Sequence, residues 1–336
     1  MKFFKYISVF FVLFATYGCT AQIGGFPGSF SRYGFSARGI AMGNAMTSVT
    51  TGDLVGYYNP ALSVFQNDHL INLSYSFLAF DRTLNFVSYT KNFKLPKQDQ
   101  GGAGITFSWI NSGVSNIDGR DADGVHTDNY SVSENQISFA PAIKFSEKFA
   151  AGVTFKFYYS KLFDGVKSTS LGFDLGAVYK VSSKVNLGFT VKDLNSKYNW
   201  NTTDLYKQNG NTTINKFPTL FNFGISYFLP KNFGLVSVDF QAASGTVVQN
   251  DVEYKAKSNI VRMGVEITPV QYLNLRAGFD KFDLSQNDKF GNSNLNFGIG
   301  YQKPFKNYTI GLDYSFVMES YSNKPFQTLT AVFKLR

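Results

Sequence analysis

The stretch VTFKFYYS, residues 153–160, decides the fold class of this chain, because its side chains alternate between apolar and polar character. Val153 and Phe155 fall on one face of an extended strand and Thr154 and Lys156 on the other, since successive residues of a strand point to opposite sides. Such alternation is typical of a β-strand that has one apolar and one polar face.

The same alternation recurs along most of the chain. It is clear in LGFDLGAVY (171–179), FNFGISY (221–227) and LNFGIGY (295–301), where aromatic or aliphatic residues alternate with small or polar ones. Read in this way, the pattern predicts about fourteen strands. We expect them near residues 69–80, 83–93, 102–112, 132–145, 149–161, 169–181, 184–194, 218–229, 233–243, 258–268, 272–282, 293–303, 307–318 and 326–335.

The composition indicates that the polar faces of these strands line a lumen and the apolar faces meet lipid. Phe (36) and Tyr (20) are abundant, and charged residues make up only 16%, well below the roughly 25% usual in soluble domains. No apolar run long enough for a membrane helix follows the N-terminal segment, which leaves a closed barrel as the membrane-spanning option. A soluble periplasmic sandwich or propeller is the alternative, but the aromatic face is too large for its core. We therefore predict an all-β protein, a transmembrane antiparallel β-barrel of about fourteen strands.

The connections between the predicted strands alternate in length, as they do in outer-membrane barrels. Short turns follow most even-numbered strands, near Ser146, Ser182, Pro230, Pro269 and Phe305. Long loops follow most odd-numbered strands, at 113–131, 195–217, 244–257, 284–292 and 319–325. The long loops are therefore expected on the cell surface, with the short turns and both termini in the periplasm.

The N-terminus carries an export signal. Lys2 and Lys5 precede the apolar run 6–15, which is too short to cross a bilayer. Cleavage after Ala21 gives a signal peptide at 1–21, although processing as a lipoprotein at Cys19 is an alternative. We expect the protein in the outer membrane of a Gram-negative bacterium, in contact with its lipid.

Between the signal peptide and the barrel, taken as residues 68–336, lies a part without strand periodicity, residues 22–67, which we call the hatch segment. Ser36 is expected to cap a helix that ends by Thr50, and Gly39 and Gly43 to allow close approach to the barrel wall. Asn59 followed by Pro60 predicts a second helical turn at 60–65. A barrel of this size is too wide for its own side chains to fill. The hatch segment is therefore expected to plug the lumen, the alternative being a periplasmic docking arm.

The hatch segment also carries a recognisable motif. Ser-Ala-Arg-Gly-x-x-Met-Gly-Asn-Ala, an acidic residue and Tyr-Tyr-Asn-Pro-Ala-Leu follow one another. This series resembles the N-terminal signature of the PorV/PorQ family, which is similar to the FadL-type barrels with their N-terminal hatch. The residues that we assign to this motif are Ser36, Arg38, Gly39, Met42, Gly43, Asn44, Asp53, Tyr58, Asn59 and Pro60.

Several ionisable residues fall on the polar sides of the predicted strands. Inside a polar lumen such residues pair across neighbouring strands, and a binding or conduction site is the alternative. They are Lys144, Lys156, Asp174, Lys192, Asp239, Arg262, Glu266, Arg276, Asp280 and Asp313. Arg38 and Asp53 of the hatch segment could pair with charges of this set.

Other chemistry finds little support in the sequence. Cys19 is the only cysteine, and His69 and His126 stand alone, so no disulfide, zinc site or catalytic triad is proposed. The carboxylates at 118–123 resemble a calcium loop only in part, because Arg120 interrupts the ligand spacing. The formal charge of +9 is scattered, which fits a membrane surface better than nucleic acid. We expect no enzyme activity, no cofactor and no metal.

Two functions remain open. The PorV/PorQ resemblance implies an accessory barrel of type IX secretion, which handles exported proteins or supports their surface attachment and has secretion-system proteins as partners. The FadL-like architecture implies a channel for a small hydrophobic ligand that leaves through a gap in the wall. The polar residues on the predicted lumen face favour the first function. Long outer loops with aromatic side chains, suited to protein recognition, favour it too; these side chains are Tyr130, Tyr198, Trp200 and Tyr206. The alternative for these aromatic residues is the girdle at the membrane interface.

Overall fold

The computed structural model describes residues 26–79, 81–95, 101–206, 210–249, 252–286, 288–320 and 324–336. The expected signal peptide and the lipoprotein alternative at Cys19 lie outside the described residues. Fourteen strands form one closed antiparallel barrel, in which β1 pairs with β16, and β8 and β9 form a separate two-stranded sheet. The predicted fold class is therefore confirmed. None of the helices in the described part of the chain is long and apolar enough to span a bilayer.

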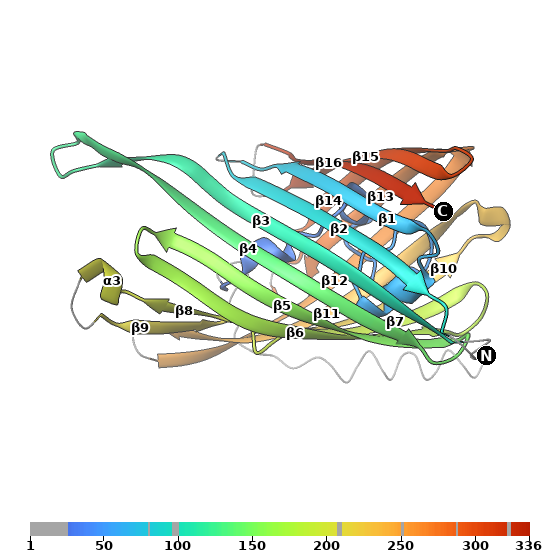
Figure 1. The fold of residues 1–336 in the computed structure, drawn as a ribbon, viewed down its shortest axis with the longest axis horizontal. Coiled ribbons are helices and arrows are strands. Elements are labelled where there is room, and N and C mark those ends of the chain that lie inside the picture. Colours follow the sequence, from blue (N-terminus) through green and yellow to red (C-terminus); the bar gives the residue numbers. More distant parts are fainter. Residues whose placement is uncertain are drawn as a thin grey trace.

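The barrel strands are long, tilted and joined in sequence order (Figure 1). They are β1 (His69–Phe77), β2 (Thr83–Phe93), β3 (Gly102–Arg120), β4 (His126–Lys144), β5 (Phe149–Phe163), β6 (Val166–Lys180), β7 (Val185–Leu194), β10 (Thr219–Phe228), β11 (Gly234–Gln249), β12 (Val252–Val270), β13 (Leu273–Asp283), β14 (Asn294–Pro304), β15 (Tyr308–Glu319) and β16 (Phe326–Leu335). The separate sheet consists of β8 (Lys197–Asn201) and β9 (Thr212–Lys216). The short helices are η2 (Ser29–Arg32), α2 (Ala37–Ala41), η3 (Pro60–Phe65), α3 (Thr203–Tyr206) and η4 (Pro230–Asn232).

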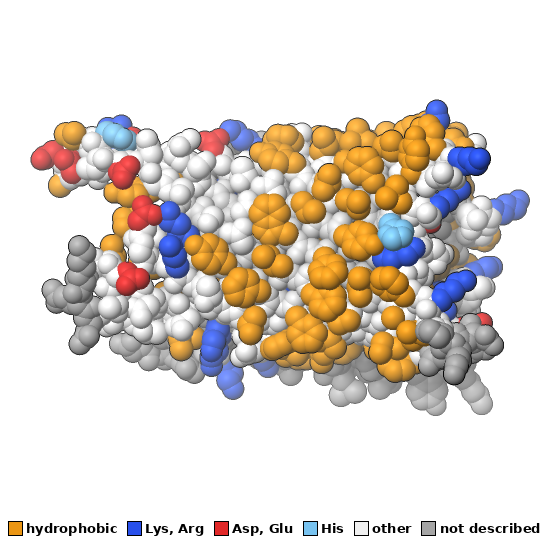
Figure 2. All heavy atoms as spheres, viewed as in Figure 1, with side chains coloured by type: hydrophobic (Ala, Val, Ile, Leu, Met, Phe, Trp, Pro, Cys, Tyr) orange, Lys and Arg blue, Asp and Glu red, His pale blue; other side chains and the backbone are white. Residues whose placement is uncertain are grey.

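The two faces of the wall follow the alternation in the sequence. Phe155 and Phe223 point outward and are 48% and 41% exposed, whereas their neighbours Lys156 and Asn222 are buried inside. Inside the barrel, hydroxyl and amide side chains bond across strands, as Asn222 Nδ2 does to Thr190 Oγ1 at 2.8 Å. The space-filling view shows the apolar side chains spread over the outer wall, with charged side chains toward its two ends (Figure 2).

The two ends of the barrel differ in the length of their connections. Short turns join β4 to β5, β6 to β7 and β14 to β15 at the end where the C-terminus lies (Figure 1). At the opposite end, β3 and β4 continue well past the barrel as one hairpin. The segments 113–131 and 244–257 are thus largely strands rather than loops, and 195–217 contains β8, α3 and β9. The sequence does not show these extensions to be strands, because they have no apolar face and are held together by cross-strand hydrogen bonds.

Candidate functional site

The hatch segment, described from residue 26, lies inside the barrel. Helix α2 packs against β13, β14, β15 and β16, and η3 packs against β2 to β6, so the segment spans the lumen from one wall to the other. The backbone of the hatch segment contacts the backbone of the wall at two glycines. A Cβ on Gly278 of β13 would collide with Gly43, and a Cβ on Gly264 of β12 would collide with Met42. Only glycine permits so close a contact between the hatch segment and the wall.

Three expectations for the hatch segment are wrong. Ser36 makes no capping hydrogen bond, and its φ of 66° departs from the extended backbone usual for an N-cap residue. The N–H of Ala37, the first residue of the helix, donates to Thr330 Oγ1 of the wall at 2.8 Å. Helix α2 ends at Ala41 and does not reach Thr50, since Gly43 and Asn44 adopt positive φ angles of 61° and 60°. Gly39 packs against the Tyr58 ring rather than the wall.

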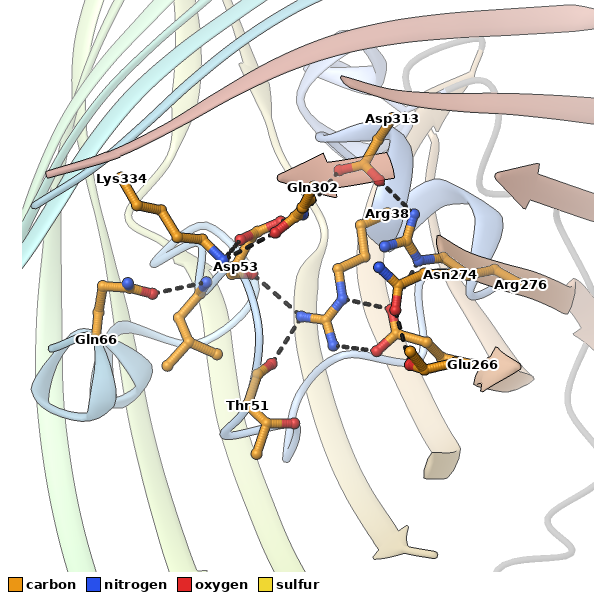
Figure 3. Close-up of polar contacts among 12 residues, drawn as sticks. Arg38, Thr51, Asp53, Gln66, Glu266, Asn274, Arg276, Gln302, Asp313 and Lys334 are labelled. Atoms are coloured by element: carbon orange, nitrogen blue, oxygen red, sulfur yellow. Dashed lines mark hydrogen bonds and ion pairs between the residues drawn. The ribbon is translucent and has the colours of Figure 1, made fainter. Parts of the chain in front are cut away.

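Arg38 fixes the hatch segment to the wall through a buried ion pair (Figure 3). Its guanidinium binds Glu266 of β12 in a two-point contact, Nε to Oε2 and Nη2 to Oε1, both at 2.7 Å. The remaining nitrogen donates to the Thr51 carbonyl at 2.7 Å. Arg276 of β13 binds the same Glu266 at 2.7 Å and Asp313 of β15 at 2.6 Å. The network thus joins the hatch segment to three strands.

Asp53 makes a second attachment on the neighbouring strands (Figure 3). One carboxylate oxygen lies 2.6 Å from Nζ of Lys334 on β16, and the other accepts a hydrogen bond from Gln302 of β14 at 2.5 Å. Asp53 is 2% exposed. Buried charges persist only when paired, so Arg38 and Asp53 hold the hatch segment in one position.

Asn44, Tyr58 and Asn59 complete the attachment. Asn44 donates to Asp280 of β13 at 2.8 Å and accepts from the Tyr58 hydroxyl at 2.8 Å. The Asn59 side chain accepts from the N–H of Ala61, as an N-cap does, and donates to the Ala177 carbonyl of β6 at 3.0 Å. Pro60 follows as the first residue of η3. Most residues of the motif therefore contact the wall, whereas Gly39 and Tyr58 pack within the hatch segment.

Seven of the ten charges expected in the lumen lie inside the barrel in ion pairs: Lys156, Asp174, Arg262, Glu266, Arg276, Asp280 and Asp313. They form the pairs Lys156–Asp174, Arg262–Asp280, Arg38–Glu266, Arg276–Glu266 and Arg276–Asp313. Sequence reasoning missed Asp193, which binds Lys156 at 2.8 Å. Lys192 is on the predicted lumen face, so strict alternation would point the next residue, Asp193, toward lipid. The adjacent charges Lys192 and Asp193 were the signal that the alternation breaks there.

The β-ladder between β6 and β7 ends just beyond Asp193. The pairing of β7 with β6 shifts between Phe173 and Leu175, and Asp193 and Asn195 have positive φ angles of 62° and 57°. After this bend the chain continues as β8, which pairs with β9 and, among the described residues, forms no β-ladder with β6. We call residues 193–196 and 217–218 the wall break. Gly172 of β6 leaves room for Ser196, since a Cβ there would collide with the serine hydroxyl.

Aromatic side chains fill the space directly inside the wall break. Phe217 lies with its ring centroid 5.0 Å from Tyr158 and 4.9 Å from Tyr198, both in edge contacts. Phe30 of the hatch segment adds an edge contact to Tyr158 at 6.5 Å, and Trp200 lies 4.9 Å from Tyr198. We call these five residues the aromatic cluster. Tyr198 is 5% exposed, so its predicted role as a surface-recognition residue is wrong.

A small, polar cavity lies beside the hatch segment. A cavity of about 30 Å³ lies between hatch segment and wall, next to Arg32, Asn44, Tyr57, Lys192, Asn222 and Arg262. Lys192 donates to the Tyr57 carbonyl at 2.8 Å and lies over the Tyr57 ring. A volume of this size holds about one or two waters.

The other aromatic residues assigned to surface recognition are not gathered into one patch. Tyr130 lies on the protruding β3–β4 hairpin and contacts Phe163 at 5.0 Å between ring centroids. Trp200 is half-buried in the aromatic cluster. The side chain of Tyr206 lies outside the described residues.

The carboxylates at 118–123 serve the hairpin itself. Asp121 accepts hydrogen bonds from the N–H groups of Asp123 and Val125. Hydrogen bonds from His126 and Arg120 lower the pKa of Asp118. No group of three or more His, Cys, Asp or Glu suited to a metal ion occurs among the described residues.

Several transporters of known structure share this fold. The toluene transporter TodX of Pseudomonas putida has a TM-score of 0.59 and 14% identity, covering 90% of this chain and 97% of TodX. The toluene transporter TbuX of Ralstonia pickettii has a TM-score of 0.57 and 14% identity, covering 90% and 98%. A Pseudomonas aeruginosa FadL homologue has a TM-score of 0.53 and 10% identity, covering 88% and 97%. No protein-family model and no curated protein matches the sequence.

At these identities the likeness shows the fold alone. The chain has the fold of these channels, and its fourteen-stranded barrel with an apolar exterior confirms the expected location in a Gram-negative outer membrane. The comparisons give no support for the PorV/PorQ family in particular.

Proposed function

We propose that this protein is an outer-membrane channel through which small hydrophobic molecules pass sideways into the bilayer at the wall break. The single observation that carries the proposal is the aromatic cluster directly inside the wall break. The sequence favoured an accessory role in type IX secretion, because the lumen faces of the strands are polar. The cluster comes instead from the hatch segment, β5, β8 and Phe217, which that argument did not bring together.

The axial route does not suit an apolar solute. The hatch segment crosses it and is held by buried ion pairs to β12 and β16, and a cavity of about 30 Å³ beside the segment has a polar lining. Breaking buried ion pairs to admit an apolar molecule is costly. A solute that passes through the aromatic cluster replaces contacts between aromatic rings with its own apolar contacts to those rings. No buried ion pair has to be broken on this route.

The similar structures support the same class of solute. TodX and TbuX are described as toluene transporters, and CymD, with a TM-score of 0.56 and 12% identity, as a monoaromatic hydrocarbon channel. A small aromatic hydrocarbon matches the size and character of one ring of the aromatic cluster. We therefore expect an aromatic solute to occupy the cluster by displacing a ring such as Phe217.

Uptake of toluene by cells that carry the protein tests this proposal. Phe217→Ser places a hydroxyl in the aromatic cluster, and Phe221→Ser is the matched control, because Phe221 faces lipid and is 43% exposed. We expect wild type and Phe221→Ser to raise toluene uptake above that of cells without the protein, and Phe217→Ser to reduce it. Heat-modifiable migration on gels verifies that each variant folds. Uptake by wild type no faster than by cells without the protein contradicts the proposal.

Accessory work in type IX secretion is the second candidate, because the β3–β4 hairpin projects beyond the barrel with both faces exposed. A hairpin of this kind could hold an exported protein at the cell surface. Copurification from outer membranes in mild detergent, with wild type and with residues 115–129 replaced by a short turn, tests this role. Recovery of secretion-system or exported proteins with wild type alone supports it, and identical recovery from both argues against it.

A further inference from the structure

The end of the barrel that carries the short turns is strongly basic. Exposed Lys or Arg side chains occur at the turns β2–β3, β4–β5, β6–β7, β10–β11 and β14–β15 and at the C-terminus. We call them the basic ring: Lys94, Lys148, Lys184, Lys231, Lys303, Lys306 and Arg336. In the described part of these turns and of the link before β1, the only side-chain carboxylates are Asp68 and Glu147. Blue side chains accordingly dominate the right-hand end in Figure 2.

The positive charges of the basic ring are not neutralised within the described part of the protein. Among the described residues, no member of the basic ring forms an ion pair. Lys303 lies over the ring of Phe305 at 5.7 Å, and the Arg336 guanidinium donates to the Lys306 carbonyl at 3.4 Å. The basic ring is therefore free to meet an external anion.

Exposed aromatic side chains lie at the same level as the basic ring. Phe145 stacks on Phe149 across one turn, with 5.7 Å between ring centroids, and Phe305 stacks on Tyr308 across another at 4.8 Å. All four are between 39% and 62% exposed. Aromatic residues at the ends of transmembrane strands mark the headgroup level of the bilayer, so the basic ring lies beside lipid headgroups.

The opposite end has a different charge pattern. Exposed Asp118, Asp121, Asp123 and Asp128 occur there together with Arg120 and other basic residues. The excess of positive charge is thus confined to the end with the short turns, which the rule for outer-membrane barrels places in the periplasm. That end adjoins the inner, phospholipid leaflet of the membrane.

We propose that the basic ring binds the headgroups of anionic phospholipids in the inner leaflet. The charges follow the circumference of the barrel, with only the β12–β13 turn lacking one. A planar layer of headgroups surrounds the barrel and can contact every charge of the ring, whereas a globular acidic protein would contact the charges on one side only. Each Lys or Arg near an anionic membrane surface contributes about 1 kcal/mol, so the ring distinguishes phosphatidylglycerol from neutral phosphatidylethanolamine.

Lipid binding to the full chain in detergent, measured by native mass spectrometry, tests this proposal. The variant carries Lys148→Gln, Lys184→Gln, Lys231→Gln and Lys306→Gln. Its matched control neutralises four exposed lysines away from the basic ring, Lys167, Lys216, Lys257 and Lys289. A second variant, with arginine at the four ring positions, retains the charge.

We expect wild type, the control and the arginine variant to retain phosphatidylglycerol in preference to phosphatidylethanolamine. The glutamine variant should lose affinity by roughly fivefold for each lysine that contacts a headgroup. Equal retention of the two lipids by wild type overturns the proposal. Equal loss in the control and the ring variant also overturns it, because the effect then follows net charge rather than position.

Discussion

Replacing Glu266 by Gln should loosen the hatch segment and destabilise the barrel. Glu266 accepts hydrogen bonds from two buried guanidiniums, two from Arg38 and one from Arg276, each at 2.7 Å. An amide in its place keeps one acceptor oxygen, but its NH₂ group then faces a donor. Arg276 retains Asp313 and Arg38 retains the Thr51 carbonyl, so both cations stay partly bound. Removing one partner of a buried pair costs about 3 to 5 kcal/mol.

Urea unfolding of the protein in lipid vesicles, followed by tryptophan fluorescence, measures this cost. Asp164→Asn is the matched control: it removes a carboxylate that pairs with Lys161 at the surface, with the Asp164 side chain 71% exposed. An exposed pair contributes at most about 1 kcal/mol. In the double variant Arg38→Gln/Glu266→Gln the loss should be smaller than the sum of the single losses, because neither partner remains as an unpaired charge. If Glu266→Gln costs no more than Asp164→Asn, the buried network does not hold the hatch segment.

Three further perturbations probe other parts of the structure. Asn59→Ala removes the cap of η3 and the contact with the Ala177 carbonyl, so the unfolding free energy should fall by about 1 to 2 kcal/mol; a loss below about 0.5 kcal/mol would contradict the capping role. Phe223→Arg places a charge on the lipid face and should cost about 2 to 4 kcal/mol in the same assay, whereas Phe223→Leu should cost much less; equal losses would show the strand register to be wrong. Protease added to intact cells should cut the exposed turn at 121–125 and leave the turn at 182–184 intact, and the reverse pattern would invert the assigned orientation.

The barrel strands could be predicted because their pattern is local. Residues 326–335 form β16 as expected, and β10 (Thr219–Phe228) differs from the predicted range by one residue at each end. Each strand meets lipid on one side and the lumen on the other, so the sequence alternates wherever the membrane is crossed. In the β3–β4 hairpin both faces meet water, and there the alternation no longer marks the strand.

The features missed from the sequence depend on contacts distant along the chain. Ser36 has the right identity for a cap, but its positive φ departs from the backbone of a capping residue, and the first helical N–H binds Thr330 of β16. Asp193 faces inward because of an irregularity in the pairing with β6. The aromatic cluster assembles residues from position 30 to position 217, and no local periodicity relates them.

The central claim is that the hatch segment closes the barrel axis, so that solutes can leave only through the wall. Conductance in planar bilayers tests it most directly, with the full chain compared with a variant that lacks residues 36–58. The full chain should stay near background, since the cavity beside the hatch segment is about 30 Å³. The deletion should leave a heat-resistant barrel that conducts ions, because fourteen strands enclose more space than their own side chains fill. Background conductance from a correctly inserted deletion variant, or open-pore conductance from the full chain, would contradict the account.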